Sequence, residues 1–409
     1  MSFNNFDTLP HGASKSIKPF KVDIPQQDLD SLTTLLKLSP LPPPTYENSL
    51  PEGGEPRLGV RRDWLSTAKR YWETEFDWRK CEKHINSFPH FKAPISIPIH
   101  AADDNELGDR GRDRGNRGDS EFEIHFVALF SQRHDAIPIL LLHGWPGSFL
   151  DSSRSSTISV RSTHPGHYHK NFRPDDAARV FDTLAATTLG FKSYMVQGGD
   201  LGGRIARIIA ATYPSCKAVH LNTHPMPAPA PDELKERSPI TDTEQAGLER
   251  HAFFLHNGTA YAFEHATRPA TIGAVLSSSP LALLSWIGEK FLDWTDEPHP
   301  PLDVILESVT LYWLTNCAAT SLYSYRAFYG PNADSHGSKK WHIFDKSLGY
   351  SWFPKELNPI PRAWIETTGY LVFYRQHEKG GHFAALERPE ELWADIDEFA
   401  QSVKDVFQK

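Results

Sequence analysis

Cysteine is scarce in this sequence. Only three cysteines occur among the 409 residues, at Cys81, Cys216 and Cys317, so they are odd in number and far apart. This pattern excludes a disulfide framework and a Cys-x-x-Cys metal site. Because such usage is typical of proteins from a reducing compartment, we expect a cytoplasmic protein.

Long apolar runs and an excess of positive charge are also lacking. The N-terminus, MSFNNFDTLPHGASKS, has no apolar core for a signal peptide, and no run approaches the roughly 18 apolar residues of a membrane span. Lysine and arginine total 43 against 51 acidic residues, which gives a net charge of −8. We therefore expect neither a membrane anchor nor a nucleic-acid partner.

One low-complexity segment interrupts an otherwise globular composition. Residues 101–120 read AADDNELGDRGRDRGNRGDS. Arginine and glycine in this density are typical of RNA-binding segments, but six acids oppose four arginines and aromatic residues are absent. Phosphate attraction and base stacking would both be weak, so we predict a disordered loop.

Strand and helix patterns alternate through much of the chain. Apolar residues alternate from Phe122 to Phe130, which predicts a half-buried strand. Further strands are predicted at 138–142, 194–197, 218–221 and 371–374, and helices at 201–213 and 392–403. This order predicts an α/β fold, with a mostly parallel central sheet and helices on both of its faces.

Two regions depart from this alternation and suggest a division of the chain. Residues 1–120 contain predicted helices at 22–38 and 65–76 and form an N-terminal extension that carries the low-complexity insert. Residues 225–345 are mainly helical and aromatic and read as a cap. The core then consists of residues 121–224 and 346–409.

The predicted strand at 194–197 runs into the turn Gly198-Gly-Asp-Leu-Gly202. A nucleophile elbow is a tight turn between a strand and a helix, and it needs small residues two positions before and two after the nucleophile. Gly198 and Gly202 meet this need around Asp200. A carboxylate at this place can attack a saturated carbon and form an ester that water cleaves, so Asp200 is the candidate nucleophile.

An earlier turn, His143-Gly-Trp-Pro-Gly147, follows the strand at 138–142. An α/β-hydrolase fold builds its oxyanion hole from the amide after the nucleophile and from one amide of such a loop. These amides would belong to Leu201 and Trp145.

The general base of this fold comes last in the chain, after the nucleophile and an acid. His382 lies between the last predicted strand and the final helix. We interpret Glu356 as the acid that orients it. Glu366 and Glu378 are alternatives that the sequence leaves open.

Together, these motifs resemble those of the epoxide hydrolases of the microsomal type, in their soluble fungal form. The resemblance covers nearly everything from residue 17 onward, including the motifs at 143–149, 197–200 and 381–384 and the cap segments at 260–264, 272–290 and 311–314. It implies an enzyme that converts an epoxide and water to a vicinal diol through an aspartyl ester. Its nucleophile, acid and base fall on Asp200, Glu356 and His382.

The resemblance also implies two cap tyrosines that hydrogen-bond the epoxide oxygen and donate a proton to it. They fall on Tyr261 and Tyr325, with Tyr323 and Tyr329 close enough to compete for the second place. No metal or organic cofactor is implied. The expected partner is a small-molecule epoxide, and the chain could form a homodimer.

Residues 149–172 depart from the family pattern, which has a helix, a strand and a proline-glycine-aromatic turn at this place. The stretch at 150–156 is too short and serine-rich for the helix, and the strand and turn have only faint equivalents at 158–160 and 165–168. The histidines at 164, 167 and 169 cluster here without an acid or cysteine partner, so no metal site is predicted.

Two other functions are alternatives to epoxide hydrolysis. A haloalkane dehalogenase also uses an elbow aspartate, but it needs halide-binding indole or amide groups where the cap tyrosines are expected. A catalytically impaired relative that acts as a binding protein would account for the altered segment at 149–172, but it would not account for a complete set of catalytic residue types.

Overall fold

A single sheet organises the chain. The structure is a computed structural model that describes residues 6–51, 58–98, 120–152, 158–162, 172–329 and 339–408. Within them, nine strands have the order β1-β2-β3-β5-β4-β6-β7-β8-β9. The strands are β1 (Lys18–Phe20), β2 (His90–Ile97), β3 (Ser120–Val127), β4 (Ile139–Leu142), β5 (Ile158–Ser162), β6 (Tyr194–Gly198), β7 (Cys216–Leu221), β8 (Ile343–Trp352) and β9 (Gly369–Gln376).

Most of the strand pairs are parallel. The six strands from β5 to β9 along the sheet pair in parallel, whereas β1 with β2, β2 with β3 and β3 with β5 are antiparallel. The predicted α/β fold with a mostly parallel sheet is therefore confirmed. The carboxyl ends of parallel strands meet at one edge of a sheet. Leu142 at the end of β4 pairs with Gly198 at the end of β6, so the two predicted motif turns leave the sheet side by side.

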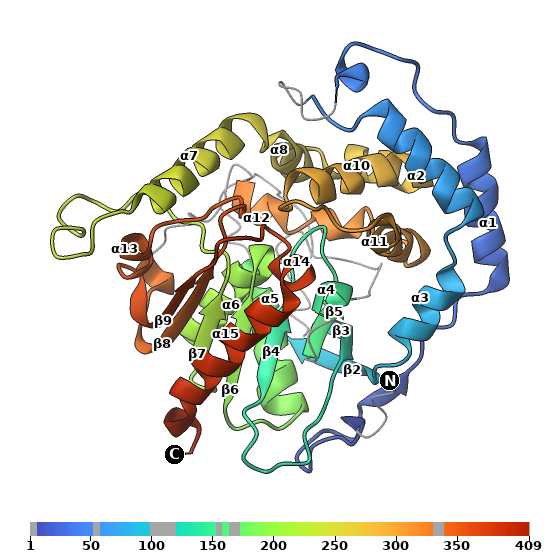
Figure 1. Cartoon of the computed structure of the whole chain (residues 1–409). Helices are drawn as coiled ribbons and strands as arrows, with labels where there is room; N and C mark the ends of the chain where they lie inside the picture. Colours follow the sequence, from blue (N-terminus) through green and yellow to red (C-terminus); the bar gives the residue numbers. More distant parts are fainter. Residues whose placement is uncertain are drawn as a thin grey trace, which may run out of the picture.

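Helices cover both faces of the sheet, as Figure 1 shows. One face packs against α5 and α6, and the other packs against α15, whose Ile396 and Phe399 lie with Met195 of β6. Central strands such as Ile-Leu-Leu-Leu of β4 are apolar at every position because both of their faces are buried. The helices of the core are α4 (Phe149–Ser152), α5 (Pro174–Asp182), α6 (Asp200–Thr212), α13 (Arg362–Ile365), α14 (Ala384–Glu387) and α15 (Pro389–Ser402).

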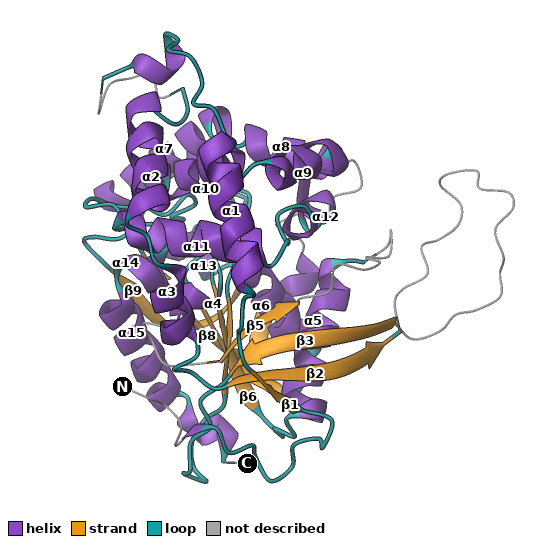
Figure 2. Cartoon of the chain, turned by 90° about the vertical axis from the view of Figure 1, so that its right-hand side faces the viewer, coloured by secondary structure: helices purple, strands orange, loops and turns teal. Residues whose placement is uncertain are grey.

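The N-terminal region contributes strands as well as helices, which the sequence did not predict. Strands β1 and β2 extend the sheet, and the helices rest on the cap, as Figure 2 shows. The predicted helix at 22–38 begins only at Gln26, because Pro25 disfavours a helical backbone at the residue before it. The helices are α1 (Gln26–Leu38), α2 (Arg62–Thr74) and α3 (Trp78–Ile85).

The segment between β7 and β8 is mainly helical and lies over the carboxyl ends of the strands (Figure 1). Strand β8 starts at Ile343, so the last residues of the predicted cap range 225–345 already belong to the sheet. The helices here are α7 (Asp242–Asn257), α8 (Ala260–Thr267), α9 (Pro269–Ser278), α10 (Pro280–Asp293), α11 (Leu302–Leu314) and α12 (Tyr325–Tyr329). Short π or 3-10 turns lie at η2 (Glu47–Ser49), η3 (Thr183–Thr188), η4 (Thr320–Leu322), η5 (Lys339–Trp341) and η6 (Lys404–Phe407).

The altered segment at 149–172 is only partly as expected. The described part of helix α4 spans Phe149–Ser152, and residues 153–157, on which the predicted shortening of this helix depends, lie outside the described residues. The strand, however, is more than a faint equivalent: β5 pairs with both β3 and β4, with Val160 opposite Phe126. The predicted turn at 165–168 and the three clustered histidines lie outside the described residues, as do residues 101–119 of the low-complexity insert.

Among the described residues, no single helix has the length and apolar character to cross a membrane. Helices α9 and α10 meet those two criteria only when taken together, across a bend of 114°.

Candidate active site

The turn between β6 and α6 is a strained elbow with Asp200 at its apex. Asp200 has a φ of 51°, in the left-handed region that side-chain-bearing residues rarely adopt. A Cβ on Gly198 would lie 2.5 Å from the carbonyl oxygen of Gly202, and one on Gly202 would lie 2.1 Å from that of Leu142. The structure therefore requires glycine at both positions, where the sequence predicted small residues.

The loop after β4 holds one oxygen of the Asp200 carboxylate. The backbone N–H of Trp145 donates to Oδ1 over 2.8 Å. Gly144 leaves the space for this approach, because a Cβ there would lie 2.0 Å from the same oxygen. Leu201 follows Asp200 on α6 and lines the same cavity as Trp145. The two predicted oxyanion residues therefore adjoin Asp200, Trp145 through its amide and Leu201 as the next residue of the chain.

His382 and Glu356 lie on the other side of this carboxylate. His382 Nδ1 is 2.6 Å from Glu356 Oε1, and His382 Nε2 is 3.6 Å from Asp200 Oδ2. Glu356 is fully buried, and its other oxygen accepts from the Thr223 hydroxyl over 2.6 Å. The backbone N–H of Leu357 donates to Oε1 over 2.6 Å. These three contacts fix the carboxylate, which in turn fixes the imidazole.

The two alternative acids lie elsewhere. Glu366 forms ion pairs with Arg362 over 2.8 Å and with Arg237 over 3.6 Å. Glu378 is exposed after β9. Of the three acids that the sequence left open, Glu356 is the one that the structure places against His382.

The charges of the pair reinforce each other. Burial opposes ionisation of Glu356, but the charge and the hydrogen bond of His382 hold the pKa of that carboxyl below its usual value. Burial also disfavours the imidazolium of His382, yet the carboxylates of Glu356 and Asp200 outweigh it and raise the pKa of His382. The Glu356 carboxylate is therefore suited to stabilise the imidazolium.

Two buried tyrosines from different cap helices lie close enough to Asp200 to be influenced by its charge. Tyr261 on α8 is 8% exposed and Tyr325 at the start of α12 is 1% exposed, with ring centroids 5.7 Å apart. Burial and the nearby Asp200 carboxylate raise the pKa of both phenols well above the ordinary value, so both stay protonated. The competing residues are less enclosed: Tyr323 lies beneath Arg326, and the hydroxyl of Tyr329 is 3.4 Å from Arg204.

Trp145 connects the loop after β4 to the tyrosines. Its indole stacks on Tyr261 at a centroid distance of 5.5 Å and 16° between the planes, and it meets the edge of Tyr325 at 5.9 Å. Trp145 thus donates its backbone N–H to Asp200 and packs its indole ring against both tyrosines.

Several residues of the site could not be predicted from the sequence. Thr223 follows β7, His265 on α8 meets Tyr325 at 4.7 Å, and Trp294 after α10 meets His382 at 5.1 Å. These contacts, to Glu356, Tyr325 and His382, each join residues far apart in the sequence, so local spacing does not indicate them.

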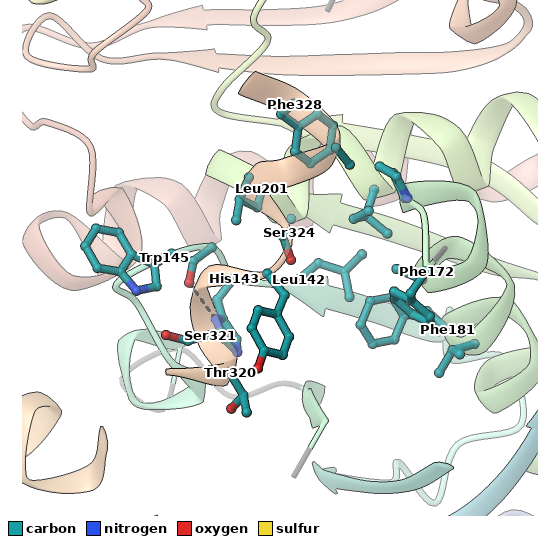
Figure 3. A pocket seen from close by; sticks show the side chains of 18 of the residues that line it. Leu142, His143, Trp145, Phe172, Phe181, Leu201, Thr320, Ser321, Ser324 and Phe328 are labelled. Carbon is teal, nitrogen blue, oxygen red and sulfur yellow. Dashed lines mark hydrogen bonds between the residues drawn. The ribbon is translucent and has the colours of Figure 1, made fainter. Parts of the chain in front are cut away.

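Two cavities border the site. A small one of about 60 Å³ contains the Asp200 and His382 side chains in its wall. A larger one of about 240 Å³ lies on the far side of Trp145 and Leu201, beneath α12, and does not include Asp200. Figure 3 shows its lining, with Trp145 at one end and Phe172 and Phe181 at the other. The small cavity is therefore nearer to the reacting groups, although the large one offers more space for an apolar substituent.

No group of three or more His, Cys, Asp and Glu side chains is arranged to hold a metal ion within the described part of the chain.

Comparison with known proteins agrees with this geometry. The family profile described as "Epoxide hydrolase N terminus" matches residues 17–152, and the profile described as "alpha/beta hydrolase fold" matches residues 149–286. The solved structure of Aspergillus niger epoxide hydrolase is similar, with a TM-score of 0.82 and 42% identity over 97% of this chain and 99% of that chain.

Curated relatives are similar along nearly their whole length. A Dothistroma septosporum protein that carries the name epoxide hydrolase is 40% identical over 96% of this chain and 92% of its own length. Epoxide hydrolase 1 of Oryctolagus cuniculus is 28% identical over 95% of this chain and 90% of its own. With this similarity added to the elbow, the buried acid-base pair and the cap tyrosines, the chain belongs to the epoxide hydrolase family.

Proposed function

We propose that this chain hydrolyses an epoxide to a vicinal diol through a covalent ester on Asp200. One observation carries the proposal: a single carboxylate lies between a backbone N–H donor, a buried imidazole and two protonated phenols. This is the set of groups that opening a strained ether and then cleaving an ester requires.

Ring opening uses Asp200 and the tyrosines. Oδ2 of Asp200 attacks a ring carbon, the C–O bond breaks, and the electron pair passes to the ring oxygen. Tyr261 and Tyr325 hydrogen-bond that oxygen and supply a proton, because an alkoxide is otherwise a poor leaving group. Oδ1 is already held by the Trp145 amide, so it becomes the carbonyl oxygen of the ester.

Ester cleavage uses the opposite side of the site. His382 removes a proton from a water, which attacks the ester carbonyl carbon, and Glu356 stabilises the imidazolium that forms. The amides of Trp145 and Leu201 would hold the charge that develops on Oδ1. As the ester bond breaks, the imidazolium protonates the leaving alcohol oxygen and the diol is released. The carboxyl proton that remains from the water then replaces the proton that the tyrosine gave up, which restores the carboxylate.

The alternatives from the sequence gain no support from the site. A dehalogenase would have to bind a halide where two phenols face Asp200. A binding protein would not need the buried Glu356 and His382 pair. The larger cavity is lined mainly by apolar and aromatic side chains, which favours an epoxide with an apolar substituent. The scarcity of cysteine supports a cytoplasmic location.

The test is diol formation from a panel of aryl and alkyl epoxides by wild type, Asp200→Asn and Asp200→Ala. We expect turnover by wild type and none by either variant, with thermal melts showing that all three are folded. If folded wild type yields no diol from any epoxide, the proposed function is wrong. If a variant retains turnover, the nucleophile is another residue.

A further inference from the structure

A buried lysine lies beside the tyrosine pair and has no part in the mechanism above. Lys290 is near the end of α10, and its side chain is only 6% exposed. Its ammonium forms an ion pair with the adjacent Glu289, whose side chain is 28% exposed. Lysine usually extends its charged end into water, and enclosing an ammonium costs free energy. A position so near the reacting groups therefore calls for a physical explanation.

Three aromatic rings surround the ammonium. Nζ lies 4.8 Å from the ring centroid of Tyr261, 5.5 Å from that of Trp286 and 5.7 Å from that of Trp294. The faces of aromatic rings are electron-rich, so each contact offsets part of the desolvation of the ammonium. The shortest of the three contacts is the one to Tyr261, which faces Asp200.

Tyr261 changes its charge during ring opening, if the proposed function is correct. Its O–H donates to the ring oxygen as the C–O bond breaks, and the phenol gains phenolate character. A cation beside the ring interacts more strongly with a phenolate than with a neutral phenol. Such a difference lowers the barrier, because it is larger in the transition state than in the ground state.

The charge of Lys290 also acts on His265, which contacts both tyrosines. His265 lies between the two phenols, with ring centroids 5.4 Å from Tyr261 and 4.7 Å from Tyr325. Burial, followed by the charge of Lys290, lowers the pKa of His265 to about 3. His265 thus stays neutral and accepts from the Trp286 indole N–H over 3.0 Å. Arg204 also favours the Tyr261 phenolate, but its guanidinium lies against Phe328 and Tyr329.

We propose that Lys290 is a positioning residue for the ring-opening step, and that it acts through Tyr261 by stabilising the phenolate character that develops when Tyr261 protonates the epoxide oxygen. The inference rests on the proposed function. Lys290 transfers no proton. The proton passes from Tyr261 to the ring oxygen, and the phenolate regains one from water in the hydrolytic half of the cycle.

The variant Lys290→Met tests this, because it keeps the length of the side chain and removes the charge. In single-turnover experiments we expect ester formation from an alkyl epoxide to slow by about 10- to 100-fold, which corresponds to roughly 1.4–2.7 kcal/mol. The rate of ester hydrolysis should stay the same. The loss should shrink for epoxides with electron-withdrawing substituents, since their alkoxides need less proton donation.

Lys92→Met is the matched control. Lys92 on β2 also combines an ion pair, with Glu123 over 2.8 Å, and a ring contact, with Phe20 over 4.6 Å, but it lies in the sheet away from the cap. We expect wild-type rates from it. Lys290→Arg, which keeps the charge, should recover part of the ring-opening rate.

A readout that is independent of turnover separates this inference from the proposed function. In protein labelled with 13Cζ-tyrosine, the Tyr261 signal, assigned with Tyr261→Phe, should shift in Lys290→Met and stay in place in Lys92→Met. An unmoved signal would overturn the role of Lys290 whether or not the chain hydrolyses epoxides. An equal loss for all epoxides, or an equal loss in both half-reactions, would also overturn it and would indicate a structural role.

Discussion

At the scale of single residues, different groups contact the two oxygens of the Asp200 carboxylate. Oδ1 of Asp200 accepts from the Trp145 amide, and Oδ2 faces His382 at 3.6 Å. The two tyrosines approach from the cap, and in the proposed mechanism they donate a proton in the ring-opening step. Each half-reaction can therefore be removed by itself.

Replacing His382 with glutamine should stop the cycle at the ester. Ring opening depends on Asp200 and the tyrosines, whereas ester cleavage needs a base for the attacking water. We expect His382→Gln to gain the mass of one substrate molecule when it is mixed with an epoxide, and intact-protein mass spectrometry measures this gain. Asp200→Ala serves as the control and should gain nothing. A His382→Gln protein that still releases diol at the wild-type rate would contradict the assignment.

Replacing Glu356 with glutamine should move the pH dependence of ester cleavage. The base acts only when it is neutral, so the rate rises with pH through the pKa of His382. Burial lowers that pKa, but the carboxylates of Glu356 and Asp200 together outweigh burial, and Glu356 is the larger contributor of the two. In Glu356→Gln the pKa of His382 should fall, and the rising limb of the rate should appear at lower pH, with a lower plateau. Single-turnover rates across pH check this, and a limb that stays in place would refute it.

At the scale of elements, the elbow depends on how closely β4, β6 and α6 approach one another. A Cβ on Gly202 would lie 2.1 Å from a backbone oxygen of Leu142, which a rotamer change cannot relieve. We expect Gly202→Ala to destabilise the fold by about 1–3 kcal/mol or more, as overpacking does. Urea unfolding measures the change. Gly12→Ala, whose new Cβ would meet only atoms at 3.6 Å, should be nearly neutral.

The elements themselves were predictable where burial imposes a simple period. Strands β4 and β6 and helices α6 and α15 were found because they are apolar runs or have one apolar face. Strand β2 was missed because it contains Pro94, and proline argues against a strand. The sheet tolerates Pro94 because β1 pairs only with residues 90–92, so among the described residues no strand neighbours Pro94 on that side.

The residues of the site could be predicted from the sequence where they belong to short local motifs. Asp200, Trp145 and His382 belong to local motifs, whereas the choice of Tyr325 over its neighbours depends on which of them is buried against Tyr261. Part of the environment of Lys290 can be seen in the sequence. Trp286, Lys290 and Trp294 are spaced by four residues, which places them on one side of a helix. The ring of Tyr261 that completes this environment comes from another helix and could not be read from that spacing.

At the scale of the whole molecule, buried histidines should make the fold sensitive to acid. Burial lowers the pKa of His220 to about 4 and that of His265 to about 3, and it lowers the pKa of His224 and His90 as well. These groups are neutral in the folded chain, so the unfolded chain binds protons first as the pH falls. Their contribution is complete above pH 6.5, the usual histidine pKa, and is lost as the pH falls toward 4.

Urea unfolding at pH 7.5 and pH 5 checks this expectation. Each strongly shifted histidine should cost about 2 kcal/mol at pH 5. Glu387, whose pKa burial raises to about 7, and His382 act in the opposite direction and offset only part of the loss. In His220→Gln the difference between the two pH values should shrink by about 2 kcal/mol. Equal stability of wild type at the two pH values would count against this expectation.

The closeness of Asp200 to His382 has a consequence for timing. Before an epoxide binds, the carboxylates of Glu356 and Asp200 favour the protonated form of His382, and a protonated imidazole cannot act as a base. Ester formation removes one of those charges, because an ester is neutral. The imidazole then loses the contribution of Asp200 to its raised pKa, so it becomes a better base once an ester is present. In this proposed order, the charge of Asp200 determines when His382 can act as a base. The two half-reactions therefore follow each other without a conformational change.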